Sequence, residues 1–380
     1  MEKYKKYLNK YTYLLIGLIV LTVSSVLFII PNFETEEFSQ EVIEDIVEGI
    51  TTTTVINNEE DQSNISSQEV LIEEDLQISE EEKIAIQDIL INNKTEKIIE
   101  GFNTYLLIGS DERSGKSIET RGKVDGKRAD VIILGLIDKE SKESTLLSFP
   151  RDLLVENTCT QKLERINAAY VKNACGNSAE NLAAAIYSIS GIKIDHFASF
   201  DFEGFEEIID SVDGIEICVD VTQKEGYSFE LQKGCQNVNG LATLNWVVSR
   251  STEVLIGEKK VDANGNDNSE WKLMSGVSDL TRITRQQYVV VQLINELKEF
   301  KSVAELNKFI KALENTFVID ENLTINKAVE LLWDFREFDL SKIKKITTPV
   351  DYLTLNDGRQ VLVLNQNLYE FLVKESVIDS

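Results

Sequence analysis

Three apolar stretches decide the fold of this chain: 103-NTYLLIGS-110, 131-VIILGLI-137 and 144-STLLSF-149. Each is short, rich in isoleucine, leucine or valine, and bordered by charged residues. Such bounded apolar runs are typical of buried strands in a sheet. We therefore predict three strands at the centre of a folded domain.

The segment that follows these runs alternates between two periodicities. Residues 178–189 and 203–212 have the apolar spacing of helices, whereas 197–202 and 215–219 are strand-like. Gly191 is a stop signal after the first helix, and Ser178 is its expected N-cap. The alternation predicts an α/β fold in which a central, mostly β-sheet is sandwiched by helices, an α/β/α arrangement.

Farther along, helical spacing recurs before a polar loop at 257–268 and again after it. The first helix, 239–250, would bring Arg250 near its C-terminal end, and the second, 281–299, begins with Arg282, Arg285 and Gln286. A helix start is a favourable place for phosphate oxygens. In the tail we expect helices near 302–314, 325–335 and 366–375, and strands within 343–354 and at 360–364.

The N-terminus has the pattern of a membrane anchor. Four lysines lie within residues 1–10, and residues 11–33 carry no charge. We predict a cytoplasmic tail over 1–10 and a transmembrane helix over 11–31, with the rest of the chain outside the cell membrane. A cleaved signal peptide is the alternative, but its apolar region would be unusually long and the cleavage site poor.

Residues 32–100 are strongly acidic and account for most of the formal net charge of -26. Isoleucine, valine and leucine residues are scattered between the glutamates without a sustained helical or strand periodicity. We predict an extended, self-repelling extracytoplasmic linker. The remaining residues divide into a catalytic domain over 101–300 and an extension over 301–380 that completes the same sheet.

The four cysteines fall in the exported part of the chain, as two locally spaced pairs. We expect two disulfides, Cys159 with Cys175 and Cys218 with Cys235, formed in an oxidising compartment. A zinc site is the alternative, but it needs tighter spacing or histidines, and the chain has only His196.

Arginines and aspartates recur where the apolar runs end. In a chain this acidic, such arginines suggest a local site for anionic oxygen, with metal-binding carboxylates beside it. We interpret the set as a magnesium-assisted clamp for a pyrophosphate. The residues are Asp111, Arg113, Arg128, Asp130, Arg151, Asp152, Arg250, Asp279, Arg282 and Arg285.

The same residues occur in a series of ordered motifs that resembles the LytR-CpsA-Psr family of cell-envelope glycopolymer transferases. The resemblance covers about residues 103–299 and continues more weakly in the tail. No single motif is specific, but nine in order with family-like spacing are. In chain order they are Leu107–Asp111 with Arg113; Arg128–Asp130; Ser148–Asp152; Arg165–Tyr170; Ile194–His196; Phe202–Phe205; Gly234, Cys235, Asn239 and Gly240; Arg250; and Asp279, Arg282, Ile283, Arg285, Gln286 and Gln287.

The resemblance implies a membrane-anchored enzyme of known reaction type. It would take a glycopolymer from a polyprenyl-pyrophosphate carrier and join it through a phosphodiester to a hydroxyl of peptidoglycan, with a possible pyrophosphatase side activity. Phosphoryl transfer needs charge stabilisation and alignment of oxygens, which arginines and Mg²⁺ supply without a histidine base. The resemblance also implies an apolar tunnel for the polyprenyl chain.

We assign roles to the site residues on this resemblance. Asp111 and Asp130 are the expected Mg²⁺ ligands, Arg113 and Asp152 orient the groups beside them, and Asp279 activates the acceptor hydroxyl or caps its helix. Turn or cap roles for the aspartates, and surface ion pairs for the arginines, are the structural alternatives. The expected pyrophosphate donors are Arg128, Arg151, Arg250, Arg282, Arg285 and Gln286, with Arg151 and Arg250 also catalytic.

One departure from the family pattern affects this clamp. Where relatives commonly have two arginines flanking one residue, this chain has Val248, Ser249 and Arg250. Losing one charged donor at a transition state could cost about 2–4 kcal/mol unless another cation compensates. A catalytically weak or inactive protein that binds lipid-linked glycan is therefore the alternative function. Nucleic acid is excluded as a partner because the chain offers no basic face.

Overall fold

The computed structural model describes residues 34–48, 78–110, 128–171, 175–274, 279–300, 303–323 and 339–379. Its centre is a seven-stranded sheet in the order β1-β14-β7-β2-β3-β4-β15. The strands are β1 (Glu34–Glu36), β2 (Phe102–Ser110), β3 (Ala129–Asp138), β4 (Ser144–Ser148), β7 (His196–Phe200), β14 (Phe317–Asp320) and β15 (Lys344–Thr347). Pairing is antiparallel at β14–β7, β2–β3 and β3–β4, and parallel at β1–β14, β2–β7 and β4–β15.

The three strands predicted from the apolar runs form the middle of this sheet. Along β2 the side chains alternate between fully buried and half-buried positions. Leu106 and Ile108 point into the largest hydrophobic core, whereas Leu107 belongs to a smaller cluster with Ile133 and Leu146. Successive side chains of a strand point to opposite faces. The two faces of the sheet therefore have separate cores.

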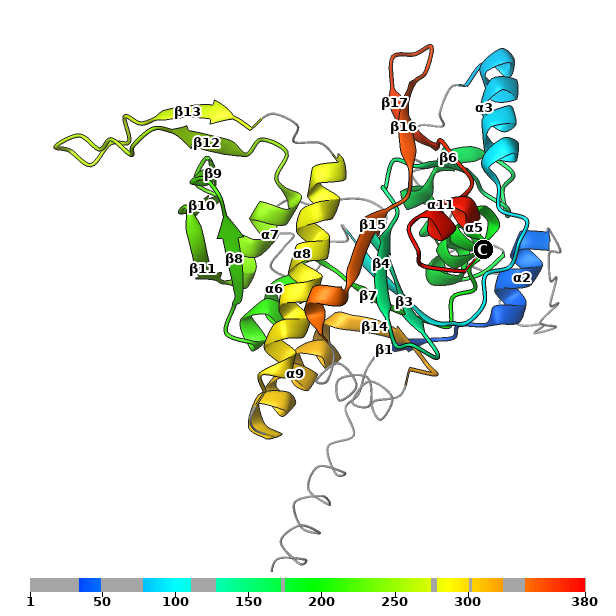
Figure 1. The fold of residues 1–380 in the computed structure, drawn as a ribbon, viewed down its shortest axis with the longest axis horizontal. Coiled ribbons are helices and arrows are strands. Elements are labelled where there is room, and N and C mark those ends of the chain that lie inside the picture. The colour runs from blue at the N-terminus through cyan, green and yellow to red at the C-terminus, as the bar shows by residue number, and fades with distance from the viewer. Residues whose placement is uncertain are drawn as a thin grey trace, which may run out of the picture.

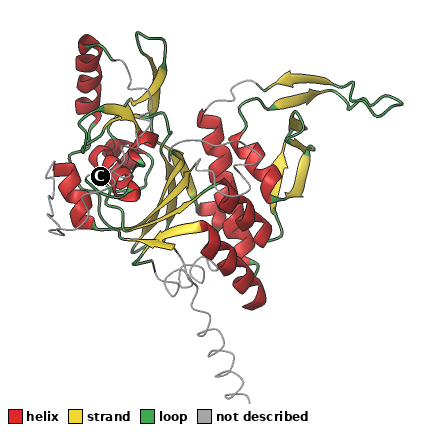
Figure 2. Cartoon of the chain, turned by 180° about the vertical axis from the view of Figure 1, so that it is seen from behind, coloured by secondary structure: helices red, strands yellow, loops and turns green. Residues whose placement is uncertain are grey.

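Helices cover both faces, which gives the α/β/α arrangement (Figure 1). Helices α2, α5 and α11 lie on one side of the sheet, and α6, α7, α8 and α9 lie on the other; Figure 2 shows the same layers from behind. The helices are α2 (Gln40–Glu48), α3 (Glu80–Asn93), α5 (Ser178–Ser190), α6 (Phe202–Ser211), α7 (Gly240–Val248), α8 (Asp279–Lys298), α9 (Val303–Thr316) and α11 (Leu368–Lys374), with short 3₁₀ turns η1 (Ile166–Ala169) and η2 (Leu340–Lys342).

Helix α5 has well-defined ends that its sequence explains. Asn177, one residue before the expected Ser178, is the N-cap. Its side-chain oxygen accepts a hydrogen bond from the Glu180 backbone N–H, and the Glu180 carboxylate accepts one from the Asn177 backbone N–H, which completes a capping box. Asparagine presents its acceptor at least as well as serine at this position. At the other end, Gly191 has φ 70°, and a Cβ there would lie 2.1 Å from the Lys97 carbonyl oxygen. Only glycine fits this position.

Part of the range expected to be an extended linker is folded onto the domain. β1 pairs with β14 at the edge of the central sheet, and α2 places Ile43 and Ile46 in the core beside α5. Farther on, α3 buries Ile86 against the C-terminal segment. The linker prediction is therefore wrong for residues 34–48 and 78–100, whose isoleucines contribute enough apolar burial to fold despite the surrounding glutamates.

The tail residues complete the central sheet through β14 and β15. The other strands form smaller sheets around it, of which the four-stranded one projects from the body (Figure 1). They are β5 (Leu154–Glu156) with β6 (Leu163–Arg165); β8 (Ile215–Val219) with β11 (Gly234–Val238); β9 (Gln223–Glu225), β10 (Phe229–Leu231), β12 (Glu253–Ile256) and β13 (Glu270–Leu273); and β16 (Val350–Thr354) with β17 (Gln360–Leu364).

Two of the predicted helices fall on parts of the chain that the structure does not describe. The expected transmembrane helix over 11–31 lies outside the described residues, as does the helix expected near 325–335. Among the helices that are described, none combines the length and the apolar character that crossing a bilayer requires.

Candidate functional site

The start of α8 brings three of the predicted phosphate donors onto the central sheet. Arg282, Arg285 and Gln286 lie in its first turns and are 4%, 8% and 6% exposed. Charged side chains are seldom buried to this degree unless they have partners or a ligand. The N-terminal end of a helix also carries partial positive charge. This end of α8 is therefore suited to anionic groups.

A narrow cavity of about 40 Å³ lies between this helix end and the sheet. Its polar residues are Asp130 from β3 and Arg282 and Gln286 from α8, and the rest of its lining is almost entirely apolar. The apolar wall includes Phe200, Phe202, Phe205, Leu244 and Val248. The cavity thus joins a charged end to an apolar body, as a site for an amphipathic phosphate ester requires.

A second cavity, of about 160 Å³, continues along the same face of the sheet. The two cavities share Leu107, Ile133 and Val290 in their walls. The larger one extends under α8 to Ile294 and Ile343. The two cavities thus lie next to each other on this face of the sheet, the larger one farther from the charged end.

A chain of ion pairs orders the polar residues beside the narrow cavity. Arg151 Nη1 donates to Asp130 Oδ1 at 2.7 Å, and Arg151 Nε lies 3.8 Å from Asp152 Oδ2. Asp152 Oδ1 in turn lies 3.2 Å from Arg165 Nε. The side chains of Arg151 and Asp130 are only 17% and 16% exposed, so their attraction is screened less than on an open surface. The close contact of Arg151 is thus with Asp130, and the orienting role of Asp152 stays a prediction.

Arg285 makes its contacts with the protein itself. Its Nη1 donates to the Trp246 carbonyl oxygen at 2.8 Å and its Nη2 to Thr252 Oγ1 at 3.0 Å, and its guanidinium lies over the Trp246 ring. Burial lowers the pKa of Arg285 to about 10, so the group remains protonated at neutral pH. These bonds fasten the end of α7 to α8. Sequence reasoning could not separate this structural role from pyrophosphate binding.

The departure at Val248 has a clear place in the structure. Val248 is the last residue of α7 and lines the narrow cavity, close in sequence to Arg250, which is exposed to solvent. The valine extends the apolar wall of the cavity. Of the residues that line this cavity, Arg282 is the cation.

The remaining predicted site residues are placed only in part. Arg128 is half-buried directly before β3, and Asp279 is the first residue of α8, though its side chain is not among those described. Asp111 and Arg113 lie outside the described residues. The structure therefore brings together Asp130, Arg151, Asp152, Arg282 and Gln286, and the roles of these and of the other site residues stay predictions.

The residues present fit a Mg²⁺ site in their donor chemistry. Asp130 offers a hard carboxylate at the edge of the cavity, and its hydrogen bond to Arg151 uses Oδ1 and leaves Oδ2 as a second oxygen. Mg²⁺ usually binds one or two carboxylates and completes its shell with water and phosphate oxygens. Asp130, with Asp111 as the expected second carboxylate, is thus suited to this ion.

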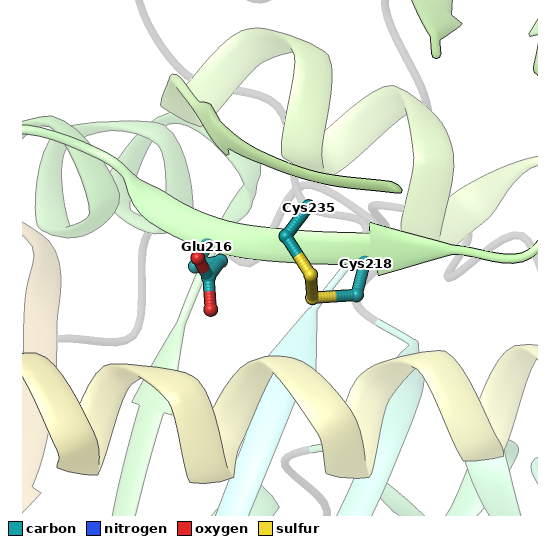
Figure 3. Close-up of side chains that lie close together, drawn as sticks. All are labelled: Glu216, Cys218 and Cys235. Atoms are coloured by element: carbon teal, nitrogen blue, oxygen red, sulfur yellow. A yellow bond between two sulfur atoms is a disulfide. The ribbon is translucent and has the colours of Figure 1, made fainter. Parts of the chain in front are cut away.

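Both predicted disulfides are present, Cys159–Cys175 and Cys218–Cys235. The second joins directly opposed residues of β8 and β11, with Glu216 beside it (Figure 3). Within the described part of the chain, these three residues are the one group of histidine, cysteine and acidic side chains close enough to share a metal ion. Because the two sulfurs are bonded to each other, they are not available as thiolate ligands.

Two residues that hold the site in place were quoted only as parts of motifs. Gln287 Nε2 donates to Ser148 Oγ and to the Ile346 carbonyl oxygen, both at 2.8 Å, and so ties α8 to β4 and β15. Arg165 pairs with Asp152 and also donates from Nη2 to the Gln360 carbonyl oxygen. Their membership of the ordered motifs was the available signal, together with the position of Gln287 directly after Gln286.

Comparison with known proteins identifies a family and several relatives. The family model described as the LytR_cpsA_psr family matches residues 48–259 and 271–376. The probable cell wall biosynthesis protein LcpB of Corynebacterium glutamicum is 33% identical over 155 residues, 39% of this chain and 36% of its own length. The polyisoprenyl-teichoic acid–peptidoglycan teichoic acid transferase TagU of Bacillus licheniformis is 25% identical over 234 residues, 61% of this chain and 62% of its own.

The chain thus spans between about a third and two thirds of the length of these two curated relatives. Among solved structures, TagV of B. subtilis has a similar fold with a TM-score of 0.55 at 21% identity. The match covers 73% of this chain and 96% of that one. At this identity the likeness concerns the fold, and it agrees with a central sheet flanked by helices.

Proposed function

The chain belongs to the LytR-CpsA-Psr family, and on that premise we propose that it transfers a glycopolymer from a polyprenyl-pyrophosphate carrier to a hydroxyl of peptidoglycan. One observation carries the proposal: an apolar space under α8 that ends at Asp130, Arg282 and Gln286, next to Arg151. The name of the TagU relative describes a transferase with a polyisoprenyl-linked donor and peptidoglycan as acceptor. Such a donor has the two parts, apolar chain and charged head, that the site can bind.

In the proposed reaction the acceptor hydroxyl oxygen attacks the phosphorus that carries the glycan. A new P–O bond forms, the bond from that phosphorus to the bridging oxygen breaks, and polyprenyl monophosphate leaves. Asp279, at the start of α8, accepts the hydroxyl proton. With water in place of the acceptor, the same displacement would be a pyrophosphatase side reaction.

The described residues contribute charge and alignment to this step. Arg151 is held by its ion pair with Asp130, and Arg282 lies buried in the cavity wall, so both charges are at the site before the substrate binds. Donors that need no reorganisation stabilise a developing charge most effectively. Asp130 and Asp111 would hold Mg²⁺, which supplies further positive charge to the pyrophosphate oxygens.

We further propose that the domain acts outside the cell membrane, anchored by residues 11–31. The two disulfides support an oxidising compartment. The apolar cavity supports a substrate that is drawn from a membrane.

The test uses the full-length protein in detergent, since a fragment beginning at residue 101 would lack β1, α2 and α3. The protein is mixed with a lipid-pyrophosphate-linked glycan and peptidoglycan, with Mg²⁺ or with EDTA, and released polyprenyl phosphate and wall-linked glycan are measured. We expect both products with Mg²⁺ and neither with EDTA. Binding of the donor without any product would instead support the non-catalytic alternative, which Val248 in the cavity wall favours.

A further inference from the structure

Gly135 lies in the middle of β3, where the fold itself does not require a glycine. Its φ is not in the left-handed region, and a Cβ added there would meet its nearest neighbours, the Tyr105 carbonyl oxygen and Cβ, at 3.6 and 3.9 Å. These are ordinary contacts. Glycine in a strand interior lowers stability and often marks a place where a ligand approaches closely.

Gly109 in β2 provides the contrast. A Cβ at Gly109 would lie 2.8 Å from the Val131 Cβ and 3.3 Å from the Phe200 ring. Gly109 also lines the narrow cavity, but its neighbours in the sheet already require a glycine at this position. No such explanation covers Gly135.

The space above Gly135 is the larger cavity. In the sheet register Gly135 lies between Tyr105 of β2 and Leu146 of β4, so a row of three residues crosses the cavity floor. The outer two have large side chains and the central one has none. Val290 and Ile294 of α8 line the same cavity, so the row forms a notch beneath the helix.

We propose that Gly135 is a specificity-determining residue that sets how long a lipid chain the site accepts. The inference rests on the proposed function. The charged head binds at Arg282 and Gln286, and the chain runs along the apolar face toward the larger cavity. A side chain at position 135 would fill the notch and stop a long chain before it reached the far end.

The experiment compares Gly135→Ala, Gly135→Val and Gly135→Leu in the full-length protein. Each variant receives two donors with the same pyrophosphate-linked glycan, one on a geranyl chain and one on an undecaprenyl chain. We expect kcat/KM for the undecaprenyl donor to fall progressively with side-chain size, reaching on the order of tenfold or more for Gly135→Leu. For the geranyl donor, kcat/KM should change by less than about twofold, which is less than the effect of one methylene group on substrate discrimination.

Folding and binding are measured separately. The Tm of Gly135→Ala should equal or exceed that of the parent, because the added Cβ meets no close neighbour. Gly109→Ala is the matched control: its Tm should fall, and any activity loss should be the same for both donors. Valine is β-branched and suits a strand, so Gly135→Val can still be measured if the leucine variant does not fold.

A binding measurement distinguishes this inference from the proposed function. Undecaprenyl phosphate and geranyl phosphate compete with a fluorescent polyprenyl phosphate for the protein. If Gly135→Leu binds undecaprenyl phosphate more weakly and geranyl phosphate as before, the inference is supported. This holds even if no variant turns over a donor, in which case only the proposed function fails. Equal effects on both lipids, or an unchanged preference, would overturn the role of Gly135.

Discussion

The face of the central sheet under α5 and the face under α8 differ in how completely their side chains are buried. Toward α5, residues such as Leu134, Leu147 and Leu182 are 0% exposed and form one large core. Toward α8, Leu107 and Ile294 are only partly buried, and two cavities remain between sheet and helix. Protein interiors are normally close-packed. The contrast indicates that the α5 face stabilises the fold, whereas the α8 face keeps space for a ligand.

The strongest test of this difference between the two faces removes Arg151, which lies beside the narrow cavity. Arg151→Ala should lower turnover on the order of 10²- to 10³-fold, because a fixed donor to the developing charge is lost. The assay is release of polyprenyl phosphate from the lipid-linked glycan. Arg359→Ala, which breaks an Arg–Asp pair in an exposed turn, is the control and should leave turnover unchanged. Full activity in Arg151→Ala would mean that the α8 face of the sheet does not hold the catalytic site.

Removing the disulfide on the α5 side should have the next largest effect. Cys159 and Cys175 pack against the large core, and the bond closes a loop with a sequence separation of 16. Cys159→Ser/Cys175→Ser should lower the free energy of unfolding by about 3 kcal/mol from chain entropy, with lost packing in addition. Denaturation with urea measures it. The double variant Cys218→Ser/Cys235→Ser, at an exposed bond of similar separation, should lose less; a greater loss there would contradict the comparison.

A cavity in the tightly packed face should also be costly. Leu182→Ala in α5 removes a fully buried side chain, and we expect a loss of about 3 kcal/mol in the free energy of unfolding. Turnover measured well below the transition temperature should be near that of the parent. A loss below about 1 kcal/mol would show that this face is less rigid than its burial indicates.

The equivalent change under α8 should have the smallest effect on stability. Ile294 is already partly buried beside a cavity, so Ile294→Ala should cost about 1 kcal/mol or less. The same urea experiment measures it. A loss equal to that of Leu182→Ala would remove the distinction between the two faces.

Much of the fold could be predicted because apolar runs and caps are local signals. The strands around Leu106, Leu134 and Leu147 form the middle of the sheet as expected, and both disulfides follow from paired spacing. The folded part of the expected linker could not be recognised, because Ile43 and Ile46 are surrounded by glutamates and gain stability only from contact with α5.

The candidate site was predicted less completely. Residue types indicated that Asp130, Arg151 and Arg282 belong near one another, and the structure places them around one cavity and its ion pairs. The separate role of Arg285 depends on contacts with Trp246 and Thr252, which are distant in sequence. The resemblance implied an apolar tunnel, but the residues that line the cavities could not be predicted, because half-buried valines and isoleucines have the same spacing as core residues.

The pairing of β1 with β14 determines how far the domain can stand from a bilayer. If residues 11–31 cross the membrane, only residues 32 and 33 lie between the span and this sheet, a reach of at most about 7 Å. The acidic range 49–77 connects α2 to α3, both docked on the domain, and so adds nothing to that reach. With such an anchor the domain would stay near the bilayer, and under the proposed function a wall polymer would have to approach the membrane surface to be modified.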